Sequence, residues 1–170
     1  MPIVLFDTPQ RNLLHPFTRT RAIAGIRAGI FTIKERWEKM TDQQGYVLTA
    51  PNPQAAYPDL PAGEKILVNA SVIPDENLVT LILNLQADEA VLKDGEVIAA
   101  ASPAGKDWSI DTITVEKFKK QVPCDSSLRK IIYPWHIFQL NDGLIRSDFE
   151  WITAGRVRQP VACGHEWTAP

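Results

Sequence analysis

The stretch Ala90-Val-Leu-Lys-Asp-Gly-Glu-Val-Ile98 decides the class of fold. Two apolar runs flank Asp94-Gly95, a dipeptide that supplies the positive φ angles of a type I′ turn, so the segment predicts a β-hairpin. A hairpin pairs antiparallel strands, whereas parallel strands need a longer crossover, usually a helix. A sheet that contains both kinds of connection is mixed.

Outward from this hairpin, apolar strands alternate with helices. The predicted strands are residues 3–6, 46–49, 65–68 and 131–133. One helix follows Gly29, with Thr32 and Glu35 at the spacing of a capping box, and a second begins at Pro74. The last helix runs from Asn141 as its N-cap to Gly155. This alternation predicts an α/β fold with a mixed, mainly parallel sheet and flanking helices.

Other segments show no strong periodicity. The four prolines within residues 51–61 predict a surface loop, and residues 102–129 indicate only a short helix near 116–120. Residues 156–170 read as an extended tail or linker. One domain is therefore expected over residues 1–155.

Composition narrows the class of protein. The 170 residues are 45% hydrophobic with a net charge of −2, which is typical of a globular domain and argues against a nucleic-acid partner. The first seven residues lack a basic region and no apolar run is long enough to span a bilayer. The expected location is the cytoplasm, with no membrane partner.

Positive charge is nevertheless concentrated in one place. Residues 11–36 hold six basic side chains and one acidic one. Arg19, Arg21 and Arg27 lie there with Gly25 and Gly29, and guanidinium groups match phosphate oxygens bidentately. Backbone N–H groups near the two glycines would add to a phosphate cradle. The alternative is a solvated basic loop.

Other candidate ligand contacts follow strands or lie near the last helix. Asn69 follows a buried strand, where α/β sheets bind ligands, or else it satisfies a local turn. Trp135 lies in a loop after Pro134, where an indole stacks on a sugar or base, although core packing is the favoured alternative. Arg146 and Asp148 are two apart on a helix, so at most one of them reaches a shared pocket.

Three segments carry a family resemblance. They are Leu14-His-Pro-Phe-Thr-Arg-Thr-Arg-Ala-Ile-Ala-Gly-Ile-Arg-Ala-Gly-Ile-Phe-Thr-Ile33, Ile66-Leu-Val-Asn-Ala-Ser-Val-Ile-Pro74, and Tyr133-Pro-Trp-His-Ile-Phe-Gln-Leu-Asn141 with Ile145-Arg-Ser-Asp-Phe-Glu150. With them, residues 3–160 resemble the N-terminal sugar nucleotidyltransferase-like domain of the alternative bacterial GlmU-type proteins, which are bifunctional uridyltransferase/acetyltransferases. A left-handed β-helix acyltransferase domain normally follows, but the chain contains no hexapeptide repeat.

The resemblance implies a reduced nucleotidyltransferase fold, which is Rossmann-like, and transfer of UMP from UTP to N-acetylglucosamine 1-phosphate with release of pyrophosphate. It implies Mg²⁺ as cofactor and a homo-oligomer formed through the absent C-terminal domain. The implied catalytic residues are Arg21 and Asp148. The implied phosphate contacts are Arg19, Arg21, Arg27 and Gly25, and the implied sugar contacts are Asn69 and Trp135.

The chain departs from the family pattern at several positions. Phe6-Asp-Thr-Pro-Gln-Arg11 replaces the usual Gly-x-Gly-Thr run, and Ile23 stands where a lysine is common. Asn69 and Ser71 occupy the strand end where active relatives carry a metal-binding aspartate, with Asp148 as the candidate replacement, and His136 replaces an aspartate. Two alternatives therefore stay open: a degenerate nucleotide-sugar binding domain, or a structural domain that supports an acyltransferase.

Overall fold

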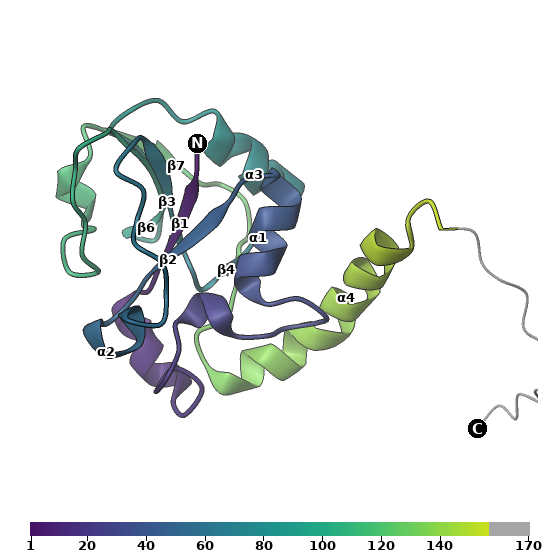
Figure 1. The fold of residues 1–170 in the computed structure, drawn as a ribbon. Coiled ribbons are helices and arrows are strands. Elements are labelled where there is room, and N and C mark those ends of the chain that lie inside the picture. Colours follow the sequence, from purple (N-terminus) through teal and green to yellow (C-terminus); the bar gives the residue numbers. More distant parts are fainter. Residues whose placement is uncertain (157–170) are drawn as a thin grey trace, which may run out of the picture.

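A six-stranded mixed sheet forms the centre of the molecule in the computed structural model, which describes residues 1–156 (Figure 1). The strand order is β2-β1-β3-β6-β5-β7. Strand β1 is parallel to β2 and β3, and β5 is parallel to β7, whereas β6 is antiparallel to both β3 and β5. Three of the five pairings are parallel, so the predicted mixed, mainly parallel sheet is confirmed. The strands are β1 (Ile3–Phe6), β2 (Gly45–Leu48), β3 (Lys65–Asn69), β5 (Glu89–Lys93), β6 (Glu96–Ser102) and β7 (Lys120–Pro123).

The antiparallel part of the sheet is the hairpin that the sequence predicts. Asp94 and Gly95 link β5 to β6 and adopt φ angles of 52° and 77°, as a type I′ turn requires. Two further short strands, β4 (Val72–Ile73) and β8 (Arg129–Lys130), pair with each other beside the main sheet.

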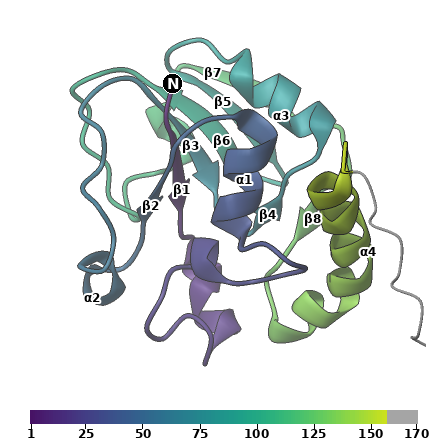
Figure 2. The same ribbon diagram turned by 45° about the vertical axis from the view of Figure 1, so that its right-hand side comes forward.

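Both faces of the sheet are buried, but they are covered differently. In β1, Ile3 and Leu5 face one apolar cluster, and Val4 and Phe6 face the other. Helices α1 (Ile33–Thr41) and α3 (Glu76–Leu83) cover the first face, as Figures 1 and 2 show. The second face is covered by an irregular segment, residues 103–118, which contains only the short 3₁₀ helix η3 (Val115–Lys117). Flanking helices are therefore present on one face only.

Aromatic packing explains how an irregular segment closes that second face. Trp108 stacks on Phe118 with ring centroids 5.4 Å apart, and its Nε1 donates to the Ser102 hydroxyl at 2.7 Å. Large rings bury much apolar area from few residues, and the indole N–H finds its partner. Such a segment has no hydrophobic periodicity, and for this reason the sequence predicted only one short helix within residues 102–129. The edge strand β7 was missed for a related reason, because most of its side chains are exposed.

Both helices that cover the first face have capped starts, one as predicted and one shifted from the prediction. The Thr32 hydroxyl accepts from Glu35 N at 3.2 Å, and the Glu35 carboxylate accepts from Thr32 N at 2.6 Å, so the predicted capping box is confirmed. Asp75 caps α3 by accepting from Leu78 N at 2.9 Å. Pro74 therefore precedes the cap, and does not form the first turn as expected.

The start of the last helix was predicted wrongly. Helix α4 spans Pro134–Thr153 and begins seven residues before Asn141. Proline suits a first helical position because its φ angle is already helical and it has no N–H to leave unpaired. Trp135 and His136 consequently lie on a helix and not in a loop, and β8 ends before the strand predicted at residues 131–133. Gly155, with a φ of 72°, does follow the helix end as predicted.

The proline-rich segment also differs from the expectation of a plain loop. It opens with the single-turn helix α2 (Pro51–Gln54), in which Pro51 occupies the first turn. Two 3₁₀ helices, η1 (Pro9–Leu14) and η2 (Ile23–Gly25), lie between β1 and α1. No helix within residues 1–156 is long and apolar enough to cross a membrane. The predicted tail lies outside the described residues except for Arg156.

Candidate functional site

The segment between β1 and α1, residues 15–31, contains all three predicted phosphate-binding arginines and is called the arginine loop below. Its first half is anchored at the end of β1 by Asp7, whose side chain is buried. The Asp7 carboxylate accepts from Ile23 N at 2.9 Å, from the Thr49 hydroxyl at 2.5 Å and from Arg11 Nε at 3.0 Å. One carboxylate thus joins β1, η1, η2 and the end of β2.

Arg11 extends this anchor to the loop backbone. Its Nη2 donates to the Thr18 carbonyl at 2.6 Å and lies 3.4 Å from the Arg21 carbonyl, and the Thr18 hydroxyl donates back to the Arg11 carbonyl at 2.5 Å. Burial raises the pKa of the Asp7 carboxyl, while the bonds from Thr49, Ile23 N and Arg11 oppose that rise. Because the Asp7 side chain is fully buried and its three hydrogen-bond partners all belong to the protein, Asp7 is a structural anchor.

Arg19 and Arg21 are exposed on the loop that this anchor holds. Among residues 1–156 neither forms an ion pair, unlike Arg11, Arg27, Arg36 and Arg146. The Arg21 side chain runs beside Gly25, since a methyl group placed on that glycine would lie 3.8 Å from Arg21 Cδ. Tyr57 lies against the same glycine, and its hydroxyl accepts from Ala22 N at 3.0 Å. Arg21 and Gly25 therefore lie side by side in the loop.

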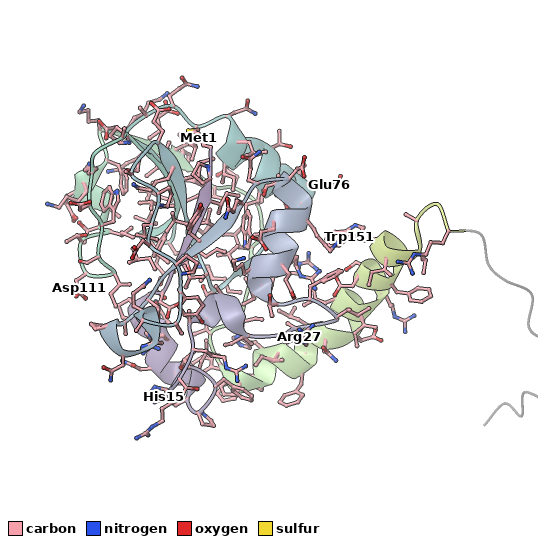
Figure 3. All side chains as sticks on the ribbon, in the orientation of Figure 1. Met1, His15, Arg27, Glu76, Asp111 and Trp151 are labelled. Atoms are coloured by element: carbon pink, nitrogen blue, oxygen red, sulfur yellow. The ribbon has the colours of Figure 1, made fainter. Side chains whose placement is uncertain are left out.

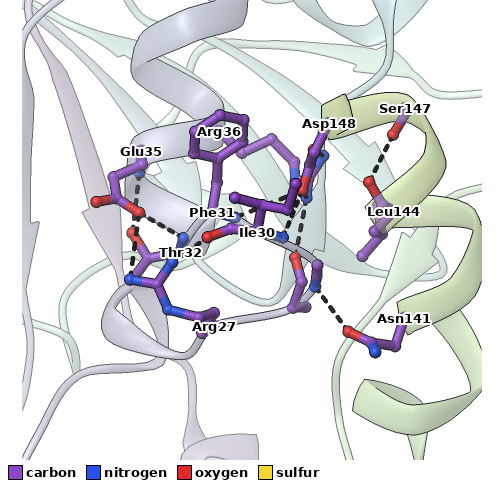
Figure 4. Close-up of polar contacts among 12 residues, drawn as sticks. Arg27, Ile30, Phe31, Thr32, Glu35, Arg36, Asn141, Leu144, Ser147 and Asp148 are labelled. Atoms are coloured by element: carbon purple, nitrogen blue, oxygen red, sulfur yellow. Dashed lines mark hydrogen bonds and ion pairs between the residues drawn. The ribbon is translucent and has the colours of Figure 1, made fainter. Parts of the chain in front are cut away.

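The second half of the arginine loop is held by Asp148 on α4 (Figure 4). Arg36 binds this carboxylate through both terminal nitrogens, at 2.5 and 2.8 Å, and also donates to the Ala28 carbonyl at 2.9 Å. The same carboxylate accepts from Ile30 N at 2.8 Å. Asp148 and Arg36 are almost fully enclosed, so both oxygens of Asp148 are engaged inside the protein.

The close approach of α4 to the loop depends on Gly29. A methyl group at this position would lie 2.4 Å from Asp148 Oδ2 and 2.9 Å from Leu144 Cβ, and the φ angle of 78° also favours glycine. Gly29 N donates to the Asn141 side-chain oxygen at 2.9 Å. Asn141 is therefore neither a helix cap nor a group free to bind a ligand. The N–H groups of Gly25 and Gly29 are both used internally.

Arg27 lies in this second half of the loop and points away from the end of β1. Its guanidinium donates to the Ile30 carbonyl and lies 4.0 Å from the Glu35 carboxylate. Figure 3 shows Arg27 beside α1 and α4, far from Asp111 on the other side of the molecule. Arg27 is thus held at the α1 end of the loop, whereas the Arg21 side chain lies beside Gly25.

Two adjoining hollows lie at the carboxyl end of β1 and share Thr8 and Pro9. The larger, of about 380 Å³, lies between η1, the start of β6 and the segment before η3. The smaller, of about 260 Å³, extends to the end of β2 and is lined by Arg11 and Asp111. Together these hollows are called the strand-end groove, and they occupy the place where open α/β sheets bind ligands.

A polar network closes one side of the groove. Gln10 donates to Glu96 at 2.5 Å, and Lys130 donates to the other Glu96 oxygen at 2.7 Å. Glu96 belongs to the hairpin, and Gln10 to η1. The network therefore connects η1, which precedes the arginine loop, to strand β6 of the hairpin.

The two predicted sugar contacts lie elsewhere. Asn69 is buried, and its side-chain oxygen accepts from Ser71 N at 3.0 Å and from the Ser71 hydroxyl at 2.8 Å. Trp135 is 53% exposed and stacks on Tyr133 with centroids 4.5 Å apart, so it is not a core residue as the favoured alternative expected. Neither residue lines the strand-end groove.

The residues at the end of β3 do not fit a metal carboxylate site. Ser71 stands where the resemblance implies a metal-binding aspartate, and it is hydrogen-bonded to Asn69. In residues 1–156 no three His, Cys, Asp or Glu side chains are grouped so as to hold a metal ion. Mg²⁺ prefers carboxylates and phosphate oxygens, and Asp7 and Asp148 are both enclosed and engaged.

Several residues of this region escaped sequence reasoning. The (i, i+4) spacing of Asp7 and Arg11 could have predicted their ion pair. Tyr57 and Glu96 lie far from the arginine loop in the sequence, so no local pattern links them to it. The Arg36–Asp148 pair joins residues 112 apart. No local pattern identifies such a partner.

The fold defines a class: mixed α/β domains, in which ligands commonly bind at the carboxyl ends of the parallel strands. The model of the family described as "Sugar nucleotidyl transferase" matches residues 3–157, and the chain belongs to that family. The predicted sugar nucleotidyltransferase-like domain is therefore confirmed, while the GlmU-type subgroup remains a prediction.

Other comparisons add only the following. No curated protein matches the chain significantly. Among solved structures, the chain is similar to a protein described as a glucose-1-phosphate thymidylyltransferase from Bacillus anthracis, in complex with sucrose, with 9% identity and a TM-score of 0.49. The match covers 85% of this chain and 95% of that chain.

Proposed function

We propose that this domain binds UTP and N-acetylglucosamine 1-phosphate and joins them with release of pyrophosphate, acting in the cytoplasm. The observation that carries the proposal is a pair of exposed guanidinium groups, those of Arg19 and Arg21, which form no ion pair within residues 1–156 and lie on a loop anchored at the end of β1. Family membership supports nucleotidyl transfer to a sugar phosphate. The choice of UTP and of the N-acetylated sugar rests on the resemblance of the loop motif.

In the proposed reaction, an oxygen of the sugar phosphate attacks the α-phosphorus of UTP. A new phosphorus–oxygen bond forms, the bond from the α-phosphorus to the bridging oxygen breaks, and pyrophosphate leaves with that oxygen. We assign two groups to neutralise the triphosphate: Arg21, and Arg19 two residues before it. Such transfers depend mainly on positioning and charge stabilisation. A loop held by Asp7 and Arg11 fits that requirement because its backbone is already ordered.

Gly25 enters this proposal only as the backbone position that lies beside the Arg21 side chain and the Tyr57 hydroxyl. Asp148 is proposed as a positioning residue and not as a catalytic residue, because both of its oxygens are bound within the protein. For Arg27, the pairing with Glu35 supports a loop-stabilising role. Asn69 and Trp135 are not carried forward as sugar contacts, because the Asn69 side-chain oxygen is buried and bonded to Ser71, and Trp135 is stacked on Tyr133.

Calorimetric titration with UTP in Mg²⁺-containing buffer tests the binding step. Loss of a charge-assisted hydrogen bond to phosphate is expected to weaken UTP binding by about 10- to 100-fold in Arg21→Ala. Arg146→Ala is the matched control, because it removes the same charge from an exposed site on α4. Equal affinity of wild type and Arg21→Ala would remove the arginine loop from the site.

A second candidate is a domain that binds the nucleotide without turnover. The pairing of Asn69 with Ser71 at the expected metal position favours it, because no carboxylate is available there. Pyrophosphate release from UTP and the sugar phosphate separates the two functions. UTP binding at micromolar concentration without any release of pyrophosphate would establish the second candidate over the first.

A further inference from the structure

The outward side of α4 carries large apolar side chains that nothing in residues 1–156 covers. Trp135, Phe138, Ile145 and Phe149 are 53%, 73%, 42% and 54% exposed. Figure 2 shows α4 along one side of the molecule, with the arginine loop and the core on its inner side. Scattered exposed apolar residues are ordinary, but a row of aromatic side chains on one helix face is typical of an interaction surface.

The spacing of this row is that of a coiled-coil seam. With Asp142 and Ile152, the row falls at positions 135, 138, 142, 145, 149 and 152, alternating steps of three and four. Such steps place the residues as the a and d positions of successive heptads, which one partner helix covers. The row is defined here as the outer seam.

The outer seam is distinct from the side of α4 that packs on the protein. Leu144 and Asp148, which are buried, point roughly 120° away from the centre of the seam at 100° per residue. Exposed polar residues such as Glu150 occupy the remaining third of the circumference. The helix therefore has two apolar contact surfaces and one solvent surface, and only one of the contact surfaces is occupied.

Asp142 and Arg146 give the outer seam opposite charges that a second copy of α4 can match. Asp142 interrupts the apolar row near its middle and pairs with the exposed Arg146 at 3.0 Å. In a parallel pair of identical helices, Asp142 would face its own copy at an a position, which is unfavourable. In an antiparallel pair centred between residues 143 and 144, Asp142 lies at the level of Ile145 and close to Arg146 of the other copy.

We propose that α4 pairs antiparallel with α4 of a second copy of this chain, through the outer seam. The same two-fold axis places Phe138 beside Phe149 of the other copy, and Trp135 beside Ile152. An interface of this kind is isologous, with one patch serving both copies, as in most homodimers. The proposed dimer goes beyond the proposed function and does not depend on nucleotide binding.

Sedimentation equilibrium of the full chain tests the dimer. Wild type is expected to be dimeric in the micromolar range, and Phe138→Glu is expected to raise the dimer dissociation constant by at least about 100-fold, because each substitution counts twice in a two-fold interface. Leu83→Glu is the matched control, since it places the same charge on an exposed apolar residue of α3, which is 40% exposed against 73% for Phe138. A wild-type chain that stays monomeric to about 200 µM would overturn the proposal.

Charge exchange tests the antiparallel register and separates a second copy from other coverings of the seam. Asp142→Arg is expected to give a monomer, because it brings arginines of both copies together, and Asp142→Arg with Arg146→Asp is expected to restore the dimer. Both side chains are exposed, so the fold should tolerate the exchange. A dimer unaffected by Asp142→Arg and by Phe138→Glu would place the contact elsewhere. A monomer whose thermal stability falls in Phe138→Glu would assign the seam to another segment of the same chain.

Discussion

Two buried carboxylates hold the two halves of the arginine loop, and they do so by different means. Asp7 is paired with Arg11, four residues along the chain, and the Arg11 side chain keeps 13% of its surface exposed. Asp148 is paired with Arg36 from a different helix, and the two side chains are only 0% and 2% exposed. Each carboxylate also accepts from a loop N–H, Ile23 for Asp7 and Ile30 for Asp148.

The difference shows how location changes the meaning of one ion pair. Near the surface, Arg11 retains contact with water, so loss of its partner leaves a charge that solvent can still reach. In the enclosed pair, removal of Asp148 would strand the Arg36 charge beneath Trp151, whose ring lies 5.6 Å from the guanidinium carbon. The buried Arg36–Asp148 pair is therefore needed for α4 to pack on the protein. The Asp7–Arg11 pair, called the half-open pair below because Arg11 still reaches solvent, orders a local turn.

Removing the enclosed carboxylate should have the largest effect. Asp148→Ala is expected to lower the free energy of unfolding by about 3–5 kcal/mol, because it leaves a buried guanidinium without a counter-charge. Urea unfolding measures this loss. Glu150→Ala on the same helix is the control, because Glu150 is exposed and lies off the outer seam, so its loss should change stability by less than about 0.5 kcal/mol. Similar losses in the two variants would contradict the contrast.

A smaller loss of stability is expected when a side chain at Gly29 pushes the arginine loop away from the Arg36–Asp148 pair. Gly29→Ala should cost about 2–3 kcal/mol, since its methyl group meets Asp148 Oδ2 and its backbone has a positive φ angle. Gly143→Ala on α4 has open space and should stabilise by up to about 1 kcal/mol. Thermal unfolding of both variants gives the comparison. Wild-type stability of Gly29→Ala would mean that α4 and the loop do not meet this closely.

The smallest effect concerns the half-open pair and depends on pH. Burial raises the folded-state pKa of Asp7 above its ordinary value of 3.8, so its stabilising contribution is complete below that value and is lost as pH rises through the raised pKa. Wild type should exceed Asp7→Asn by about 1 kcal/mol near pH 4, and by less at pH 7.

Urea unfolding of wild type and Asp7→Asn between pH 4 and pH 8 checks this sign. A difference that grows with pH would show that Arg11 and the hydrogen bonds outweigh burial at Asp7. The same series on Asp142→Asn supplies the baseline, because that carboxylate is exposed.

Local patterns predicted much of the fold. The Asp94-Gly95 turn, the Thr32 capping box and the apolar runs of β1 and β3 each depend on neighbours within a few residues, so sequence reveals them. The start of α4 was predicted wrongly because asparagine is a common N-cap residue. In the folded protein the Asn141 side-chain oxygen instead accepts a hydrogen bond from Gly29 N of the arginine loop.

The candidate site was predictable only in part. The concentration of arginines identified the loop, and Arg21 does lie beside Gly25. The separation of Arg27 from Arg21, and the enclosure of Asn69 and Asp148, follow from how α4 and β3 pack. Side chains of one motif thus have different partners in the folded protein.

The sequence by itself determined the alternation of strands and helices, the hairpin that makes the sheet mixed, and the segment that carries the positive charge. These features arise from backbone preferences and from periodicity within ten to twenty residues. Only the tertiary structure decided which arginines stay unpaired, because pairing requires a carboxylate at the right distance in space. Asp148 reaches Arg36 across 112 residues of chain, and no local property of either residue encodes that distance.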